Sequence, residues 1–382
     1  MSQFGHGSKT VLSVNGFEPF RIGSGETFAR NLSVELGKRG WRNVLCFLTP
    51  PTEPVRRFLD LPNVSVEAIP DLWALAWAPT VALAGLLRRY RPEILHLQFT
   101  GFLSPYPWLA RYYGVKKVFF TDQASRPEGF TARRSPLWKR CATRAINYPL
   151  TRVTCISDYV IRYWDVLGVL PMDRFVRIYN SVDVFCGATD DGSAFRQKHG
   201  IPLDRPVVAQ ISWVIAEKGF DDLLEAARIV VRENPKVHFV MGGEGADRKR
   251  FMELTASMGL KDHITWTGLV GKPQEEGFYA AADIVCQASR WEEAFGCVIA
   301  EAMAAGKPVI GTRTGAIPEL VADGKTGFIV ERRSPQDLAA RILELLRDPA
   351  LRRRFGEAGK CVAIEAFNQQ KNVMEFIKLY GL

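Results

Sequence analysis

Cysteine and histidine are scarce in this sequence, and the few present are scattered. None of the 7 cysteines forms a C-x-x-C pair, and the 5 histidines do not cluster with them. This distribution excludes the disulfide framework of a small secreted domain and gives no support to a zinc site. We therefore expect reduced thiols in a cytoplasmic protein with no bound metal and no resident cofactor.

Long hydrophobic runs are also missing. An uncharged apolar stretch at residues 72–87 has 16 residues and contains Pro79. A membrane-spanning helix needs about 20 apolar residues, so this stretch predicts a helix buried in the core. Residues 1–10 contain no long apolar segment, and we expect no secretory signal peptide.

Acidic residues are sparse in the first half of the chain. Residues 1–180 contain 24 Lys and Arg against 13 Asp and Glu, whereas the remaining residues contain 26 against 28. A basic half beside a near-neutral half indicates that the N-terminal half faces an anionic partner. A membrane surface and a phosphorylated acceptor both fit. The sequence contains no nucleic-acid-binding module, so we expect no nucleic-acid partner.

Both halves alternate short apolar runs with amphipathic segments, and 382 residues suit two domains. The first half predicts a helix over 26–40 and strands over 10–16, 43–49, 93–99, 116–122, 152–157 and 175–183. The second half predicts a helix over 219–234 and strands over 206–212, 236–243, 263–268, 283–289, 307–312 and 327–330. This pattern predicts two α/β domains with doubly wound parallel sheets. The polar stretch 186–195 is the predicted linker.

The most informative segment is ASRWEEAFGCVIAEAMAAGKPVIGT, residues 288–312. Its composition predicts a helix over 295–305. In a continuous helix, the eight positions from Glu293 to Glu301 would span about 12 Å, too far for the carboxylate pair of a retaining glycosidase. The spacing instead fits an elongated ligand whose negative centre lies on free N–H groups at the helix start. We assign these N–H groups to Phe295, Gly296, Cys297 and Val298.

This segment resembles the E-x7-E signature of the family-4 retaining glycosyltransferases. These proteins have the GT-B fold, in which two Rossmann-like domains face a central cleft. The resemblance implies that Glu293 contacts the donor sugar and that Glu301 binds the ribose of the nucleotide.

Other segments of the second half are similar to the same family. EKGFDDLLEAA (217–227) resembles the segment whose lysine, here Lys218, holds the donor diphosphate; a cation there stabilises the leaving group. FVMGGEGADRKRF (239–251) resembles a glycine-rich turn and implies donor contacts for Gly243 and Glu244. ITWTGLV (264–270) resembles the loop that contacts the base near Leu269, and GAIPELVADGKTGFIV (315–330) resembles the family's closing motif.

The first half is similar to the family over shorter segments. GSGETFARNLSVELGKRGW (23–41) resembles a glycine-rich element that implies donor contacts for Gly23 and Ser24, with Gly25 adding backbone freedom. RIYNSVD (177–183) resembles the segment just before the interdomain linker. We assign acceptor binding to Glu26, Asp122 and Arg126.

Three positions depart from the family pattern. Trp213 stands where an arginine often helps to hold the diphosphate, and Asp122 or Thr121 stands where a histidine often faces the donor sugar. Trp41 replaces a histidine after Gly40, which we interpret as a packing change. We keep Trp213 among the donor-binding residues and assign catalytic roles to Glu293, Lys218 and Asp122.

The resemblance also implies the domain organisation. We predict an N-terminal acceptor-side domain over 1–184 and a nucleotide-sugar-binding domain over 185–362. A C-terminal helix over 363–382 is predicted to cross back onto the first domain.

The resemblance implies a retaining, metal-independent transfer of a sugar from a nucleoside diphosphate sugar to a saccharide or lipid-linked acceptor. Cell-surface polysaccharide or glycolipid assembly is the expected setting, at the inner face of the membrane. Two alternatives stay open. One is a degenerate GT-B protein that acts as a binding or scaffolding subunit, and the other is a GT-B phosphorylase or epimerase.

A basic segment over 126–152 interleaves Arg and Lys with the aromatic residues Phe130, Trp138 and Tyr148. One interpretation is a solvated helix face whose aromatic side chains turn to the core. The other is a surface for an acceptor or for anionic lipid headgroups.

Overall fold

The computed structural model describes residues 9–73, 76–183 and 192–382. The chain divides into two compact units, which we describe separately. The N-terminal unit comprises residues 1–124, 131–180 and 369–382, and the C-terminal unit comprises residues 125–130 and 181–368.

Over its described residues, the N-terminal unit has a parallel sheet of seven strands in the order β3-β2-β1-β4-β5-β6-β7. The strands are β1 Thr10–Asn15, β2 Arg42–Phe47, β3 Val64–Ala68, β4 Ile94–Gln98, β5 Lys117–Asp122, β6 Arg152–Cys155 and β7 Phe175–Arg177. The helices are α1 Ser24–Lys38, α2 Glu53–Phe58, α3 Trp77–Tyr90, α4 Tyr106–Tyr112, α5 Leu137–Ile146, α6 Asp158–Leu167 and α15 Gln369–Tyr380, with a 3-10 turn η1 at Met172–Arg174.

The C-terminal unit repeats this plan. Over its described residues, six parallel strands lie in the order β10-β9-β8-β11-β12-β13. They are β8 Val207–Ile211, β9 His238–Gly242, β10 Ile264–Gly268, β11 Ile284–Gln287, β12 Val309–Thr312 and β13 Gly327–Val330. The helices are α7 Ser193–Lys198, α8 Phe220–Glu233, α9 Arg248–Ser257, α10 Phe278–Ala281, α11 Cys297–Ala304, α12 Ile317–Leu320, α13 Pro335–Arg347 and α14 Pro349–Ala366, with 3-10 turns η2 Ala216–Lys218 and η3 Lys261–His263.

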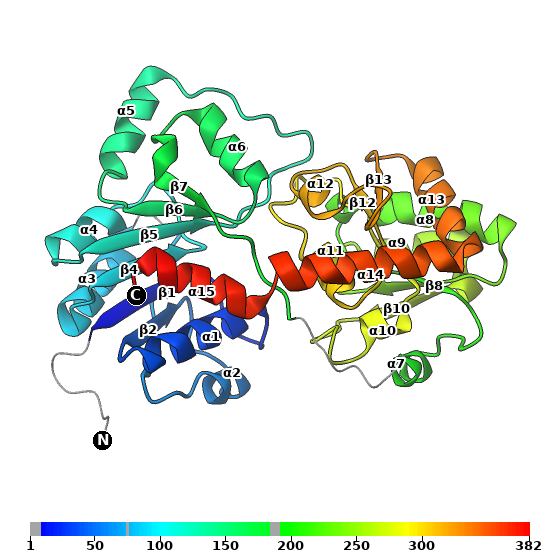
Figure 1. Ribbon diagram of the computed structural model, residues 1–382, viewed down its shortest axis with the longest axis horizontal. Coiled ribbons are helices and arrows are strands. Elements are labelled where there is room, and N and C mark those ends of the chain that lie inside the picture. Colours follow the sequence, from blue (N-terminus) through cyan, green and yellow to red (C-terminus); the bar gives the residue numbers. More distant parts are fainter. Residues whose placement is uncertain (1–8, 74–75, 184–191) are drawn as a thin grey trace. The chain divides into compact units, whose positions relative to one another are not determined.

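Helices α1 and α15, far apart in the sequence, lie side by side in the N-terminal unit (Figure 1). Leu32 and Leu36 of α1 and Phe376 of α15 share a core with residues of β1, β4 and β5. Trp41 belongs to this core and is buried, which confirms its interpretation as a packing residue. Burial of these apolar side chains supplies the main force that holds α15 on this unit.

His96 of β4 is a polar residue inside the same core. One ring nitrogen is hydrogen-bonded to the Tyr380 hydroxyl at 2.6 Å, and the other to Thr121 Oγ1 at 2.6 Å. Complete burial lowers the pKa of His96 to about 3, because the charged ring would lose its hydration. The ring therefore stays neutral and links β4, β5 and α15.

The sequence missed strand β3 and overextended β7. The edge strand β3 is half-buried throughout, so it lacks the apolar run that marks the inner strands. The strand predicted over 175–183 ends at Arg177. Most of the predicted linker, residues 186–191, lies outside the described residues, but its end is helical because α7 begins at Ser193.

The apolar stretch 72–87 contributes to helix α3. The prediction of a helix buried in the core holds for one face only: Leu83, Leu86 and Leu87 are buried, whereas Trp77 and Val81 are 82% and 49% exposed. Across the described part of the chain, every helix is too short or too polar to cross a bilayer.

Candidate functional site

Two loops of the C-terminal unit meet at the carboxyl edge of its sheet. Strands β8 and β11 are neighbours at the point where the strand order reverses, and ligands bind at such points in open α/β sheets. The side chain of Gln210 in β8 joins the loops that follow the two strands. Its amide donates to the Lys218 carbonyl at 2.9 Å, and its oxygen accepts from the Ala288 N–H at 2.9 Å.

Lys218 and Glu293 form an ion pair between these loops. Lys218 Nζ lies 2.7 Å from Glu293 Oε1, which also accepts a hydrogen bond from Ser289 Oγ at 2.6 Å. Only 14% of the lysine side chain and 8% of the glutamate side chain are exposed. The lysine also lies 5.3 Å from the centre of the Trp291 ring. An anionic ligand at this edge would compete with Glu293 for the ammonium group and would release the carboxylate for another partner.

Two glycines allow the backbones around this pair to approach closely. Gly219 has a φ of +69°, and a Cβ there would lie 1.7 Å from the Ala288 carbonyl oxygen. Gly315 has a φ of +52°, and a Cβ there would lie 2.1 Å from the Glu293 carbonyl oxygen. Any side chain at either position would displace the loop that carries Lys218 or Glu293.

Helix α11 begins at Cys297, two residues later than predicted. Gly296 precedes the helix with a φ of +107°, which ends the helical conformation there. Phe295 is 2% exposed and packs edge-to-face on Phe367, with ring centres 5.3 Å apart. Among the described residues, no backbone carbonyl accepts a hydrogen bond from the N–H groups of Cys297 and Val298, as expected for a first helical turn. The predicted helix over 295–305 was therefore wrong at its start, because Gly296 adopts a backbone conformation that no helix contains.

Glu301 lies about one turn into α11 and is held by a buried tyrosine. The Tyr279 hydroxyl donates to Glu301 Oε2 at 2.6 Å. Burial, and then the nearby Glu301 charge, raise the pKa of Tyr279 well above its ordinary value. The tyrosine therefore remains a donor at all physiological pH values and fixes the orientation of the carboxylate.

The remaining donor-side residues follow strands β8, β9 and β10 at the same edge. Trp213 and Leu269 are each 62% exposed. Gly243 has a φ of +123°, and a Cβ there would lie 1.9 Å from the Ser212 carbonyl oxygen. Glu244 is exposed and lies 3.5 Å from Arg248. The structure thus brings Trp213, Lys218, Gly243, Glu244, Leu269, Glu293 and Glu301 to one edge of one sheet.

In the N-terminal unit, four predicted site residues lie at the start of α1. The Glu26 carboxylate accepts from the Gly23 N–H at 3.0 Å and so caps its own helix. Burial raises the pKa of Glu26. Ser24 begins the helix. Gly25 is helical, so it does not use the predicted backbone freedom; instead it leaves room for Phe17, whose ring a Cβ would approach to 2.9 Å.

Asp122 ends strand β5 and is buried. Its carboxylate accepts from the Trp164 indole N–H at 2.9 Å and from the Ala124 N–H at 3.0 Å. Arg126 lies in the C-terminal unit, although its position in the sequence falls within the predicted N-terminal domain. Its backbone pairs with that of Glu292, each N–H donating to the other residue's carbonyl at 3.0 Å.

Sequence reasoning missed several residues that build the site. Glu292 is buried and accepts from the Gly315 N–H and from Arg332, both at 2.8 Å, so it holds the Glu293 loop in place. Ser289 and Tyr279 contact the two glutamates of the motif directly. Gln210 carried a signal, since it is a polar residue inside an apolar strand. Tyr279 carried none, because only the tertiary fold brings it to Glu301.

Within residues 9–73, 76–183 and 192–382, no three His, Cys, Asp or Glu side chains are arranged to hold a metal ion. The groups at this edge that can meet a negative ligand are the Lys218 ammonium and the N-terminus of α11.

Both halves of the chain match known families. Residues 191–362 match the family described as "Glycosyl transferases group 1", and residues 25–184 match "Glycosyltransferase Family 4". The alpha-D-kanosaminyltransferase of Streptomyces kanamyceticus is 31% identical over 357 residues, which cover 86% of this chain and 92% of that protein. The GDP-mannose-dependent alpha-(1-6)-phosphatidylinositol monomannoside mannosyltransferase of Mycolicibacterium smegmatis is 30% identical over 237 residues, covering 59% of this chain and 61% of that protein.

Solved structures support the fold. HepE from Anabaena, crystallised with UDP, aligns with a TM-score of 0.79 at 18% identity and covers 98% of this chain and 100% of its own. This likeness and the two parallel sheets confirm the predicted two-domain GT-B fold.

Proposed function

Because this chain belongs to glycosyltransferase family 4, we propose that it moves a sugar from a nucleoside diphosphate sugar to an acceptor hydroxyl with retention of anomeric configuration. The bond between the anomeric carbon and the diphosphate oxygen breaks, and the acceptor oxygen bonds to that carbon on the same face. The acceptor proton passes to the departing phosphate oxygen.

The Lys218–Glu293 pair beside the start of α11 is the observation that carries this proposal. A diphosphate placed between Lys218 and the free N–H groups of α11 would have its charge offset from two sides. This arrangement needs no metal ion at the diphosphate. Glu293, released from Lys218, accepts hydrogen bonds from hydroxyls of the donor sugar, and Glu301 accepts them from the ribose.

The acceptor is assigned to the N-terminal unit. Asp122 and Glu26 lie at or beside the carboxyl edge of its sheet, and both carboxylates are buried. We propose a saccharide or lipid-linked acceptor, as in assembly of a cell-surface polysaccharide or glycolipid at the inner face of the membrane. The phosphatidylinositol mannoside named for the mycobacterial relative supports an acceptor of this class.

A thermal-shift screen against UDP, GDP, ADP and their common sugar conjugates tests the donor site. A ligand that binds the native state at a hundredfold excess over Kd stabilises it by about 2.7 kcal/mol. We expect a shift with one nucleotide that is lost in Glu301→Ala and kept in Glu253→Ala, which removes an exposed carboxylate of α9. No shift with any nucleotide would favour the alternative function, a binding or scaffolding subunit. In that case Trp213, which stands in place of an arginine that helps to hold the diphosphate, would be the first suspected cause.

Product analysis then tests the chemistry. With the donor that the screen selects, the coupling constant of the anomeric proton in the product reports retention or inversion. An inverted product would overturn the retaining mechanism, and an isomerised nucleotide sugar without acceptor would indicate an epimerase. Turnover unchanged in EDTA is the expected result for a metal-independent transfer.

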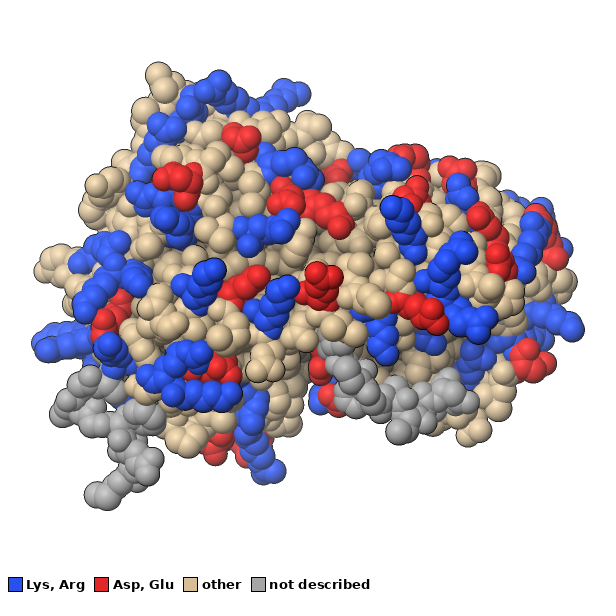
Figure 2. All heavy atoms as spheres, in the orientation of Figure 1, with Lys and Arg blue, Asp and Glu red and all other residues tan. Residues whose placement is uncertain are grey.

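We further propose that helix α5 and the segments around it contact an anionic membrane. Trp138 and Tyr148 are 73% and 69% exposed, so these aromatic side chains do not turn to the core, and the neighbouring Leu137 is 71% exposed. Arg134, Arg140 and Arg144 line a hollow of about 590 Å³ beside α5. Lys and Arg side chains gather over this end of the N-terminal unit (Figures 1 and 2). Aromatic residues among cations suit a headgroup layer.

Co-sedimentation with phosphatidylserine vesicles at low salt tests this contact. We expect binding that weakens with salt and that falls at least fivefold in Trp138→Ser. The control is Leu203→Ser, which alters an exposed apolar residue of the C-terminal unit and should leave binding unchanged. Absence of co-sedimentation at low salt would remove the proposal.

A further inference from the structure

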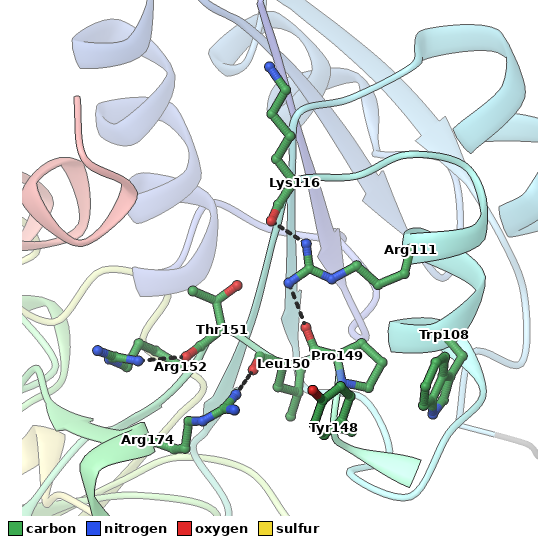
Figure 3. A pocket seen from close by; sticks show the side chains of 9 residues that line it. All are labelled: Trp108, Arg111, Lys116, Tyr148, Pro149, Leu150, Thr151, Arg152 and Arg174. Carbon is green, nitrogen blue, oxygen red and sulfur yellow. Dashed lines mark hydrogen bonds between the residues drawn. The ribbon is translucent and has the colours of Figure 1, made fainter. Parts of the chain in front are cut away.

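A second basic pocket lies at the amino edge of the N-terminal sheet, opposite the carboxyl edge that carries Asp122. Lys116 immediately precedes β5, Arg152 begins β6 and Arg174 ends η1 just before β7, so their backbones mark the amino ends of three neighbouring strands. With Arg111 of α4 they line a pocket of about 510 Å³ (Figure 3). Asp122 lies at the other end of β5, so this pocket is separate from the carboxyl edge where sugar transfer is proposed.

The arginines of this pocket are bonded to neutral oxygens. Arg111 donates to the carbonyl oxygens of Val115, Lys116 and Pro149, as Figure 3 shows in part. Arg174 donates to the Leu150 carbonyl, and Arg152 to the Thr151 carbonyl at 3.0 Å. These bonds hold the guanidinium groups in place, but a carbonyl oxygen carries no charge to offset theirs.

Acidic side chains do not line this pocket. Among its described lining residues there is no Asp or Glu, and Lys116 pairs with Glu93, outside the lining, at 2.8 Å. Arg111, Arg152 and Arg174 therefore bring three positive charges together, and among the described residues none of the three forms an ion pair. Arg152 and Arg174 each use one of five N–H groups in the bonds above, so most of their donors remain available.

An aromatic pair lies at the side of the pocket. The rings of Trp108 and Tyr148 are nearly parallel, at 19°, with centres 6.2 Å apart. Trp108 is half-exposed and yet fixed, because its indole N–H donates to the Ala145 carbonyl at 2.9 Å. Tyr148 is 69% exposed. The pocket thus combines fixed cations with a preformed apolar wall.

We propose that this pocket binds a phosphate monoester, with the phosphate on Arg152 and Arg174 and the carbon skeleton against Tyr148 and Trp108. A phosphate monoester carries nearly two negative charges at pH 7 and three acceptor oxygens, which match several guanidinium donors. A carboxylate would offset only one of the three charges. The group belongs either to a phospholipid headgroup or to a free sugar phosphate or glycerol phosphate. The site does not depend on the proposed sugar transfer.

Calorimetric titration of the full chain with sn-glycerol 3-phosphate is the first test. We expect millimolar or tighter binding that falls at least tenfold in Arg152→Gln, a change that removes a side chain hydrogen-bonded to the carbonyl of its own neighbour, Thr151. Arg88→Gln removes the same charge from an exposed position of α3 and should change the affinity less than twofold. Tyr148→Ala should weaken glycerol 3-phosphate binding more than inorganic phosphate binding, because only the former has a carbon skeleton.

Vesicles distinguish the two sources of the phosphate group. Vesicles containing phosphatidic acid present the same monoester, whereas phosphatidylserine vesicles of equal charge do not. Stronger binding to phosphatidic acid that is lost in Arg152→Gln assigns the pocket to a lipid, and binding of the soluble probe alone assigns it to a free metabolite. The proposal is overturned if the wild type binds neither probe, or if Arg152→Gln and Arg88→Gln bind alike. The nucleotide shift should be the same in Arg152→Gln and wild type, which keeps this test separate from that of the donor site.

Discussion

The two sheets share one plan, but the carboxyl edges of their strands carry different chemistry. In the C-terminal unit, Lys218 and Glu293 are paired with each other, and an incoming anion can exchange with the carboxylate. In the N-terminal unit, Glu26 caps its own helix and Asp122 is held by Trp164. One edge carries an ion pair between two loops, and the other carries carboxylates bound to their own backbone and core.

Under the proposed function, this contrast follows from what each half would recognise. A nucleoside diphosphate always presents two phosphates and a ribose, so a lysine, a helix N-terminus and a glutamate at fixed spacing can meet it. An acceptor surface presents no comparably constant group. The feature that sets the N-terminal unit apart from the C-terminal unit is accordingly its surface, which exposes aromatic and basic side chains.

Breaking the ion pair should give the largest effect. Lys218→Met removes the cation that meets the diphosphate, and we expect turnover to fall about 100-fold or more. It also leaves Glu293 buried without its partner, which should lower the free energy of unfolding by about 3 kcal/mol. Activity assays and urea unfolding of the C-terminal unit measure the two effects.

The double variant Lys218→Met/Glu293→Gln separates stability from function. Both charges are then gone, so we expect stability to recover most of its loss while turnover stays low. Lys236→Met, at an exposed position before β9, is the matched control and should change neither quantity. Recovery of turnover in the double variant would contradict the roles given to both residues.

The second prediction concerns the loop that carries Lys218. Gly219 and Gly200 have nearly equal φ values, +69° and +66°, but only Gly219 has a backbone atom where a Cβ would be placed. Gly200→Ala should cost about 1 kcal/mol, the penalty of the left-handed conformation. Gly219→Ala should cost at least about 2 kcal/mol more and lower turnover more than tenfold, since the Ala288 carbonyl must move. Thermal unfolding and donor turnover compare the pair. Equal effects would mean that the close approach does not position Lys218.

How far the sequence predicted this molecule depends on whether the signal was local. The inner strands were predicted because each is an apolar run. Glu293 and Glu301 were proposed because residues 288–312 resemble the family's E-x7-E signature, and Lys218 because residues 217–227 resemble another segment of the family. The half-buried strand β3 has no such run. Gly296 was assigned to the helix because its neighbours favour helix, whereas its φ of +107° places it before the helix.

The supporting residues of the site could not be predicted in the same way. Tyr279 reaches Glu301, and Glu292 reaches Gly315, across long separations in the sequence. Neither contact has a periodicity or a spacing to reveal it. Gly25 shows the converse case, since a glycine chosen for backbone freedom instead provides space for Phe17.

The third prediction uses the buried histidine of the N-terminal unit. His96 has a folded-state pKa of about 3, below the ordinary value of 6.5. Above pH 6.5 the ring is neutral in both states. As the pH falls from 6.5 toward 3, only the unfolded chain takes up the proton, so native stability falls by about 1.4 kcal/mol per pH unit. The glutamine in His96→Gln cannot titrate, so the stability of this variant does not show the pH-dependent fall that His96 causes in the wild type.

The difference in unfolding free energy between wild type and His96→Gln therefore should shrink as the pH is lowered from 7 to 5. Taking this difference cancels the titration of groups common to both proteins, including His238, whose pKa burial lowers to about 4. A difference that stays constant with pH would show that His96 is not the neutral, buried link between β4 and α15. The C-terminal unit should unfold alike in both proteins.

The smallest effect should come from two helical glycines of the N-terminal unit that differ in their surroundings. Gly85 in α3 has nothing within 4 Å of an added Cβ, so Gly85→Ala should stabilise the protein by about 0.5–1 kcal/mol through helix propensity alone. Gly25 in α1 lies against the Phe17 ring, and Gly25→Ala should destabilise by about 1 kcal/mol because that ring must move. Thermal unfolding measures both. If Gly25→Ala also stabilised the protein, the Phe17 ring would not restrict the start of α1.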